Sequence, residues 1–306
     1  MGRFILGRLA FLVPTLVLVI VISTFLMKAA PGSPFAAEKE ADPAIQKQIE
    51  KKWGEDKSSW GWLKAYFAGL LKGDLGPSYK VQGKTVKELL APALPVSLCL
   101  GLLALMIAVG IGLPAGMFAG LRQNTTLDYG SMLIALVGVS LPTFVLGTGL
   151  LWLFVFQMDA LPVGGWGTLE QLILPAITLA LPFAAYIARL ARAGVLEVVH
   201  EDYIKTARAK GLPPSEVVLK HLIRGAVLPV VSYLGPAAAS ILTGGFVVEK
   251  LFRIPGMGSY FVASAINRDY FLVLGTVIVY VTLLTVFNLI VDISYAMIDP
   301  RMREHG

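Results

Sequence analysis

Residues 89–121 read LLAPALPVSLCLGLLALMIAVGIGLPAGMFAGL, and this run contains no Asp, Glu, Lys or Arg. A helix needs about 20 mainly apolar residues to cross the hydrocarbon core of a bilayer. The run is therefore predicted to be a transmembrane helix. Because it is longer than a straight crossing requires, the helix is expected to tilt or to end in the interface.

Five further stretches on either side of this run also lack the four charged residue types. They are Leu9–Met27, Tyr129–Met158, Gln171–Ala188, Gly225–Val248 and Tyr270–Val291. The whole chain of 306 residues is 56% hydrophobic and 15% charged, with a mean hydropathy of +0.72. This composition excludes a disordered chain and argues against a soluble one. The expected fold class is an all-α membrane protein with six transmembrane helices.

The first stretch has two interpretations. Arg3 and Arg8 precede it, as basic residues precede a secretory signal. However, the apolar run is 19 residues long and ends in Met27-Lys28-Ala29-Ala30, without the small residue expected three positions before a cleavage site. An uncleaved membrane anchor is therefore predicted.

The basic residues in the short loops predict the orientation, because they favour the cytoplasmic side. With a cytoplasmic N-terminus, twelve lie inside: Arg3, Arg8, Arg122, Arg189, Arg192, Lys205, Arg208, Lys210, Lys220, Arg224, Arg301 and Arg303. Three lie in the short outside loops: Lys250, Arg253 and Arg268. Both termini are therefore expected in the cytoplasm. The net charge of +6 then reflects orientation and requires no nucleic-acid partner.

The segment from Lys28 to Lys87 is the one sizeable piece expected outside the membrane. Residues 43–52 have a helical pattern, and a group of aromatic residues follows: Trp53, Trp60, Trp62, Tyr66 and Phe67. Such enrichment suits an interfacial helix that lies on the lipid headgroups. It suits equally a small cap that packs onto the helix bundle, so both interpretations stay open.

The residues do not predict an enzyme or a metal site. Residues 78–85 end in the Gly-Lys-Thr of a phosphate-binding loop, but Ser78 replaces its first glycine and the topology places it outside. The single Cys99 excludes an internal disulfide and a multi-cysteine metal site. The three histidines, at positions 200, 221 and 305, lack metal-ligand spacing. We therefore predict no catalytic residue, no metal and no cofactor in this chain.

The centres of the six stretches carry no ionisable group. Transporters driven by proton or sodium gradients usually place such groups inside the membrane. If this protein is a transporter, its energy is expected to come from a partner.

The longest inside loop runs from Arg189 to Arg224. Residues 201–211 begin with two acids and end in lysine and glycine, which predicts a short helix. Pro213 and Pro214 then interrupt the chain. Ser215 is expected to cap a second helix, and one face of this helix would carry Val218, Leu222 and Gly225.

The first of these helices has two possible uses. Tyr203, Thr206, Ala207 and Lys210 share one face, and this face has so little bulk that it could seat in the groove of a partner protein. Alternatively, its basic residues meet anionic lipid. The residues alone leave both uses open.

The loop resembles the "EAA" coupling loop of permease subunits in binding-protein-dependent ABC importers. Lys205-Thr206-Ala207 stands at the Glu-Ala-Ala positions, Gly211 is the glycine, and Leu228-Pro229 is the closing Leu-Pro. Lys205 and Thr206 differ from the Glu and first Ala of the short consensus, and Leu-Pro lies further from the glycine than in that consensus. Both differences resemble those of the oligopeptide and dipeptide branch of the family. Five other segments also resemble that branch: residues 30–34, 73–78, 255–258, 267–270 and 299–301.

This resemblance implies the type I importer (MetI-like) fold. Residues 1–92 would form the first transmembrane helix and an extracytoplasmic segment. Residues 93–300 would form the transporter domain of five helices, with the coupling loop at about 196–224, and residues 301–306 would be a cytoplasmic tail.

The resemblance also implies the partners and the location. This chain would pair with a homologous second permease in a bacterial cytoplasmic (inner) membrane. Two ATPase subunits would supply ATP hydrolysis with Mg²⁺, and an extracytoplasmic binding protein would deliver a peptide. The residues implied in coupling to the ATPases are Glu201, Asp202, Tyr203, Lys205, Thr206, Ala207, Arg208, Ala209, Lys210 and Gly211.

A second group of residues, between the last two spans, is a candidate outer gate or binding-protein contact. It consists of Pro255, Gly256, Gly258, Arg268 and Asp269. The alternative is local: the first three would shape a turn, and the last two would cap the turn before the sixth span.

Three other functions remain open at this point. The chain could be a dipeptide or nickel permease of the same branch. It could be a self-contained channel or secondary carrier, against which the uncharged span centres argue. It could also be a membrane scaffold that holds partners through the loop without transporting anything.

Overall fold

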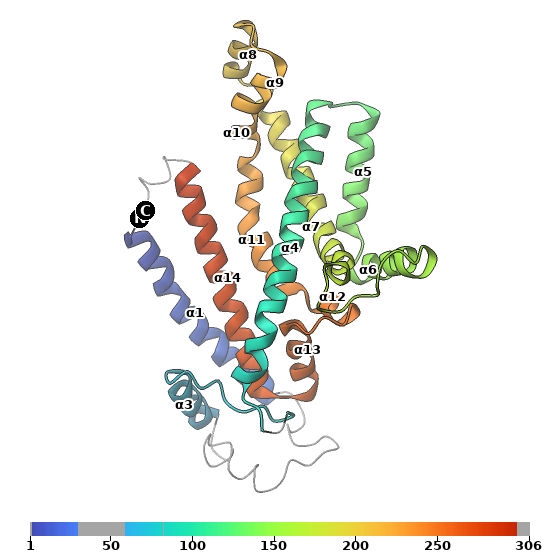
Figure 1. Cartoon of the computed structure of the whole chain (residues 1–306). Helices are drawn as coiled ribbons and strands as arrows, with labels where there is room; N and C mark the ends of the chain where they lie inside the picture. The colour runs from blue at the N-terminus through green and yellow to red at the C-terminus, as the bar shows by residue number, and fades with distance from the viewer. Residues whose placement is uncertain (1, 30–58, 82, 299–306) are drawn as a thin grey trace. The chain divides into compact units, whose positions relative to one another are not determined.

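The computed structural model describes residues 2–29, 59–81 and 83–298, and every regular element among them is a helix (Figure 1). The α-helices are α1 (Gly2–Ala29), α3 (Ser59–Leu70), α4 (Val86–Leu121), α5 (Thr126–Ser140), α6 (Thr143–Leu151), α7 (Leu169–Val198), α8 (Asp202–Ala209), α9 (Pro214–Glu216), α10 (Ile223–Ala226), α11 (Leu228–Gly244), α12 (Phe246–Leu251), α13 (Met257–Asn267) and α14 (Tyr270–Ile298). Two π-helices, η1 (Trp152–Gln157) and η2 (Val217–Leu222), continue α6 and α9.

In the described residues, five helical segments are long and apolar enough to cross a membrane: Ala10–Ala29, Val86–Leu121, Leu169–Val198, Leu228–Leu251 and Tyr270–Ile290. The remaining predicted span, 129–158, is a pair of helices bent by 107° between Thr126–Ser140 and Thr143–Gln157. Counted as one span, the pair gives the six predicted crossings.

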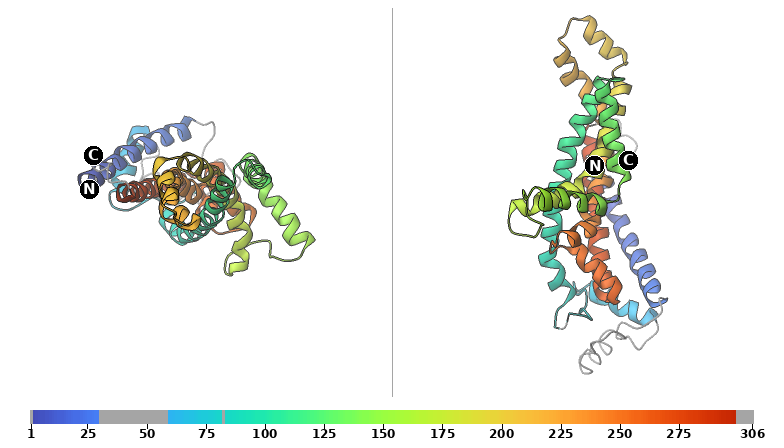
Figure 2. Two further views of the ribbon diagram at one scale, coloured as in Figure 1. Left: turned by 90° about the horizontal axis from the view of Figure 1, so that it is seen from above. Right: turned by 90° about the vertical axis from the view of Figure 1, so that its right-hand side faces the viewer.

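The bend follows from one proline. Leu141 has extended backbone angles (φ −83°, ψ 132°), because the ring of the following Pro142 disfavours the helical conformation at the residue before it. Helix α5 therefore ends there, and α6 begins in a new direction (Figure 2). The sequence predicted a span that was too long but did not predict the break.

Helix α7 is longer than the apolar run that predicted it. The run ends at Ala188, before the first arginine, whereas the helix continues to Val198. A charge does not end a helix, and no proline follows Pro182 within α7. At the other end, Thr168 and Gln171 form a capping box that fixes the first turn.

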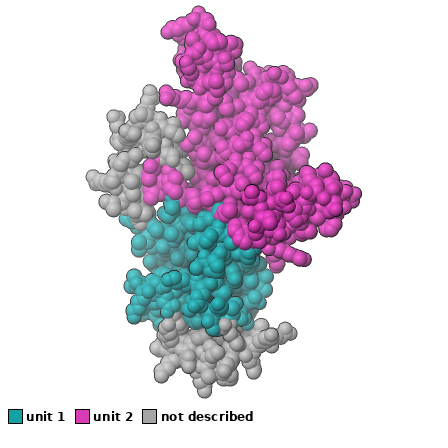
Figure 3. Space-filling view, viewed as in Figure 1, with its two compact units in different colours: residues 1–98, 255–286, 306 teal, residues 99–254, 287–305 magenta. Residues whose placement is uncertain are grey.

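The chain forms two compact units, which Figure 3 distinguishes by colour. Among the described residues, unit 1 contains those up to 98 together with 255–286, and unit 2 contains 99–254 with 287–298. Helices α4 and α14 contribute to both. The units reflect packing, whereas the predicted boundary between residues 92 and 93 is a division along the sequence and stays a prediction.

The core of unit 1 is aromatic. Trp62 and Tyr66 of α3 stack with ring centroids 5.3 Å apart, and each also packs against Phe271 at the start of α14. Trp60 is 61% exposed and lies edge-on to Phe25 of α1. Trp62 and Tyr66 thus form a cap packed on the helices of this unit. The predicted helix at residues 43–52 lies outside the described residues, as does Trp53.

In unit 2, α7 is packed against several other helices, and its contact with α4 is made by glycines. A Cβ atom on Gly112 would lie 2.4 Å from the carbonyl oxygen of Ala184, and one on Gly116 would lie 2.1 Å from that of Ala188. Real Cβ contacts are essentially never shorter than 3.0 Å. The two backbones therefore touch, as small residues permit in membrane helix pairs.

Candidate functional site

The segment predicted as the coupling loop contains the expected short helix. Helix α8 follows Glu201, whose extended backbone (φ −65°, ψ 149°) precedes the first helical turn. It ends at Ala209, and Gly211, two residues on, has a φ of +78° and donates from its backbone N–H to the carbonyl of Arg208 at 3.0 Å. Both boundaries agree with the prediction. A Cβ on Gly211 would meet nothing within 4 Å, so glycine is favoured there by the left-handed conformation and not by lack of space.

A cluster of seven buried apolar side chains holds α8 to its own chain. We refer to it as the loop cluster; its members are Val195, Val198, Ile204, Ala207, Val217, Leu222 and Ala226. The helix contributes two of them: Ile204 is 0% exposed and Ala207 is 4% exposed. The other five come from α7, η2 and α10. Helix α8 is therefore fixed to both ends of the loop.

This packing corrects the predicted face of α8. Tyr203 is 46% exposed, and Thr206 and Lys210 are also exposed, whereas Ala207 is buried inside this chain. The small side chain at position 207 therefore lets α8 approach the loop cluster and does not face outward. Sequence reasoning also missed Ile204, although it is the only large aliphatic residue in α8 and precedes Ala207 by three positions.

The opposite side of α8 is polar and accessible. Six of the predicted residues are exposed there besides Tyr203 and Thr206: Glu201, Asp202, Lys205, Arg208, Ala209 and Lys210. Lys205 Nζ lies 2.8 Å from Asp202 Oδ1, and this hydrogen bond holds the pKa of the Asp202 carboxyl below its ordinary value. The helix thus presents charges of both signs on a surface that the chain itself leaves uncovered.

The second part of the loop differs from its prediction. Pro213 is extended and Pro214 begins the next helix, so Ser215 is not its cap. The chain then forms η2, in which each turn holds more residues than in an α-helix. For this reason Val217 and Leu222, five residues apart, are both buried, whereas the α-helical pattern predicted Val218 and Leu222.

The two ends of the loop are held together by direct backbone contact. A Cβ on Gly194 of α7 would lie 2.2 Å from the carbonyl oxygen of Ala226 in α10. Figure 1 shows α8 and α9 at one end of unit 2, beyond the ends of α5 and α7. The loop is therefore a projection whose base is closely packed.

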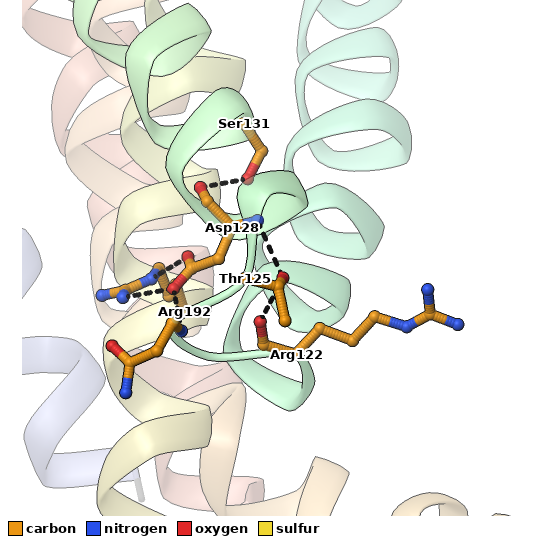
Figure 4. Close-up of polar contacts among 6 residues, drawn as sticks. Arg122, Thr125, Asp128, Ser131 and Arg192 are labelled. Carbon is orange, nitrogen blue, oxygen red and sulfur yellow. Dashed lines mark hydrogen bonds and ion pairs between the residues drawn. The ribbon is translucent and has the colours of Figure 1, made fainter.

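A charged pair beside this base was not predicted. Arg192 of α7 donates from Nε to Asp128 Oδ1 at 2.6 Å and from a terminal nitrogen to Oδ2 at 2.8 Å (Figure 4). The backbone N–H of Asn124 also donates to Oδ2, at 3.0 Å. The Asp128 side chain is 1% exposed. The only sequence signal was the position of both residues near span ends, which does not reveal the pairing.

The second predicted group, in unit 1, has a local structural role. Asp269 is 0% exposed. Its carboxylate accepts hydrogen bonds from the Ser78 hydroxyl and from the backbone N–H of Tyr79 at 3.0 Å. It also accepts from the backbone N–H of Leu272, at 3.2 Å, at the start of α14. These contacts support the local-cap interpretation of Asp269. They also give Ser78, which stands where a phosphate-binding loop requires glycine, a structural role.

The remaining members of that group divide by exposure. Gly256 and Gly258 are buried at the start of α13, whereas Pro255 is exposed. Arg268 is partly exposed and has a left-handed backbone (φ 57°) that ends α13. Of these five residues, only Pro255 and Arg268 are therefore accessible for contact with another protein.

Comparison with known proteins identifies the family of this chain. The family model described as "Binding-protein-dependent transport system inner membrane component" matches residues 112–304. The oligopeptide transport system permease protein OppB of Haemophilus influenzae is 45% identical over 305 residues, which cover 99% of this chain and 100% of that protein. OppB of Escherichia coli K12 is 44% identical, with the same coverage.

Two further comparisons concern a related branch member and the fold. The dipeptide transport system permease protein DppB of Bacillus subtilis is 40% identical over 305 residues, covering 100% of this chain and 99% of that protein. An inward-facing structure of the MetNI methionine ABC transporter aligns with a TM-score of 0.57 at 18% identity, covering 69% of this chain and 96% of that one. The predicted MetI-like fold is confirmed. A chain with these apolar spans, this projecting loop and relatives matched from end to end belongs to the family of binding-protein-dependent transport system inner membrane components.

Proposed function

We propose that this chain is a permease subunit of an ATP-driven peptide importer, with both termini in the cytoplasm of a bacterium. It forms the translocation pathway together with a homologous second permease, and α8 couples it to two ATPase subunits. The observation that carries this proposal is the two-sided packing of α8. One side is buried in the loop cluster, and the other presents uncovered charges.

This packing suits the transmission of force. ATP binding with Mg²⁺ brings the two ATPase subunits together, and their movement displaces the helices seated on them. Because Ile204 and Ala207 fix α8 to α7 and α10, a displacement of α8 moves the spans that follow. The pathway then opens to the outside, and hydrolysis returns it to the inward-open state.

The proposed cargo is an oligopeptide, delivered by an extracytoplasmic binding protein. The relatives that support this are the OppB proteins at 45% and 44% identity. The DppB relative at 40% identity supports dipeptides as a second candidate. Competition of short and long peptides for uptake separates the two candidates.

The test is reconstitution in vesicles of the complete complex, with both permeases, both ATPases and the binding protein. Uptake of labelled peptide should require ATP, and it should stop when the ATPases carry an inactivating substitution. Uptake by this chain alone, without ATPases, would overturn the proposal in favour of a self-contained channel. Failure of the complete complex to move any peptide would favour a scaffold.

The proposed contact with the binding protein is tested separately. Arg268 is the accessible charged residue of the second predicted group, so a photo-crosslinker at position 268 should capture the binding protein during turnover. A crosslinker at buried position 258 serves as the control. Equal crosslinking from both positions, or none from 268, would remove Arg268 from the interface.

A further inference from the structure

The ion pair between Asp128 and Arg192 joins two helices across 64 residues of sequence. Both carboxylate oxygens accept from the planar guanidinium group, a geometry that fixes orientation as well as distance. The Asp128 side chain is 1% exposed and the Arg192 side chain 26%. Removing such charges from water is costly, so a largely buried ion pair is weak evidence for stability. Its better-attested use is to specify one arrangement of the elements that it joins.

Helix α5 lies against α7 and buries few side chains there. Only Asp128 and Ala135 are buried among its residues Thr126–Ser140. Along the same helix, Leu133 is 63% exposed and Ile134 is 75% exposed. Small residues make part of the contact with α7, since a Cβ on Gly138 would lie 3.1 Å from the Cβ of Ala185, and small side chains alone fix a register weakly. The bidentate pair supplies that register at one end.

The pair also lies close to the base of the loop. Arg192 precedes Val195, a member of the loop cluster, by one helical turn on α7. Force on α8 therefore reaches the same end of α7 to which Asp128 is bound. Helix α5 continues from there to the 107° bend and α6.

We propose that Asp128 and Arg192 are positioning residues that make α5 follow α7 when α8 is displaced during the transport cycle. The proposal rests on the proposed function, because it concerns the step between ATPase movement and movement of the spans. Breaking the pair should leave α8 bound to the ATPases, but α5 should no longer move together with α7 during the ATPase cycle.

The same region offers a matched control. Arg122 lies in the same loop as Asn124, but its guanidinium group lies over the ring of Phe118, 4.6 Å from the ring centroid. Figure 4 shows its side chain directed away from Asp128. Replacing Arg122 removes one positive charge from this end of the molecule without touching the pair.

The first experiment measures peptide imported per ATP hydrolysed in the reconstituted complex. One variant combines Asp128→Leu with Arg192→Met, which removes both charges and leaves none buried alone. We expect it to assemble and to hydrolyse ATP normally, while the transport ratio falls by at least about fivefold, the lower end of typical coupling between sites. The reversed pair, Asp128→Arg with Arg192→Asp, should recover part of the ratio, and Arg122→Met should not change it.

Two results would overturn the proposal. A wild-type transport ratio in the apolar pair would show that the ion pair only contributes to packing. Loss of ATPase binding in that variant would show that the pair holds α8 itself.

The second experiment requires ATPases and nucleotide but no peptide. Spin labels at positions 134 on α5 and 193 on α7, both exposed, report the distance between the helices in a chain carrying Cys99→Ala. In the otherwise native chain this distance should be the same in the nucleotide-free and ATP-bound states, and in the apolar pair it should change. A distance that changes with nucleotide in the native chain would overturn the proposal. If the distances behave as expected but no peptide is imported, the proposed function fails, and what remains is that the pair holds α5 to α7 when the ATPases bind nucleotide.

Discussion

The contact between α4 and α7 gives a sharp prediction about Gly116. A Cβ at this position would lie 2.1 Å from the carbonyl oxygen of Ala188 and 2.8 Å from its Cα. Because the obstructing atoms belong to the backbone, no side-chain rotation can relieve the clash. Reaching even the 3.0 Å limit of real Cβ contacts requires the two helices to separate by about 0.9 Å.

Two opposing effects set the size of the change in Gly116→Ala. Alanine favours the helix over glycine by about 1 kcal/mol. Overpacking a close contact costs about 1–3 kcal/mol, with the upper part of that range expected where backbone must move. We therefore expect the variant to lose about 1–2 kcal/mol of unfolding free energy.

The matched control is Gly110→Ala in the same helix. A Cβ on Gly110 would meet nothing within 4 Å, so only the helix preference acts and the variant should gain up to about 1 kcal/mol. The assay is the unfolding midpoint of each purified variant in detergent, followed by tryptophan fluorescence. Equal midpoints for the two alanine variants would refute the close approach of α4 and α7.

Three further predictions concern the loop and the outer segment. Gly211→Val should abolish ATP-dependent peptide uptake with assembly intact, because a β-branched residue at φ +78° is strained by about 1–3 kcal/mol. Gly211→Asn should retain uptake. Vesicle uptake at the wild-type rate in the valine variant would contradict the prediction. Ala207→Trp should disrupt the loop cluster and lose the ATPases on co-purification. Normal co-purification of this variant would count against the packing of α8. Asp269→Ala should leave the donors of residues 78–80 without their acceptor, which costs about 3 kcal/mol of folding free energy. Trypsin should then cleave the chain faster after residue 72. An unchanged cleavage rate would show that other contacts hold residues 78–80 in place.

Much of the loop could be predicted because its signals are local. The acids at 201 and 202, and the lysine and glycine at 210 and 211, are preferences of a single helix for its own ends. The side of α8 that packs against the rest of the chain, and with it the burial of Ala207, could not be predicted from local sequence. It depends on Val195 and Leu222, which come from elements on either side of α8.

The second half of the loop shows a different limit. The predicted face assumed α-helical spacing, and the π-helix η2 changed that spacing. Likewise, the pattern of residues 129–158 predicted one apolar span, because apolar length does not reveal a change of direction at Pro142. In both cases the apolar character of the segment was recognised, but the backbone geometry was not, and in η2 this placed Val218 instead of Val217 on the buried face.

The sequence by itself determined that this chain belongs in a membrane, where its apolar runs lie, and which family it resembles. Membrane insertion depends on the summed apolar character of each run, and motif resemblance depends on residue order; both are properties of contiguous sequence. The tertiary structure alone decided that Asp269 is a buried cap, that Ala207 faces its own chain, and that Asp128 pairs with Arg192. These roles depend on which distant residues lie within a few ångströms, and packing sets those distances.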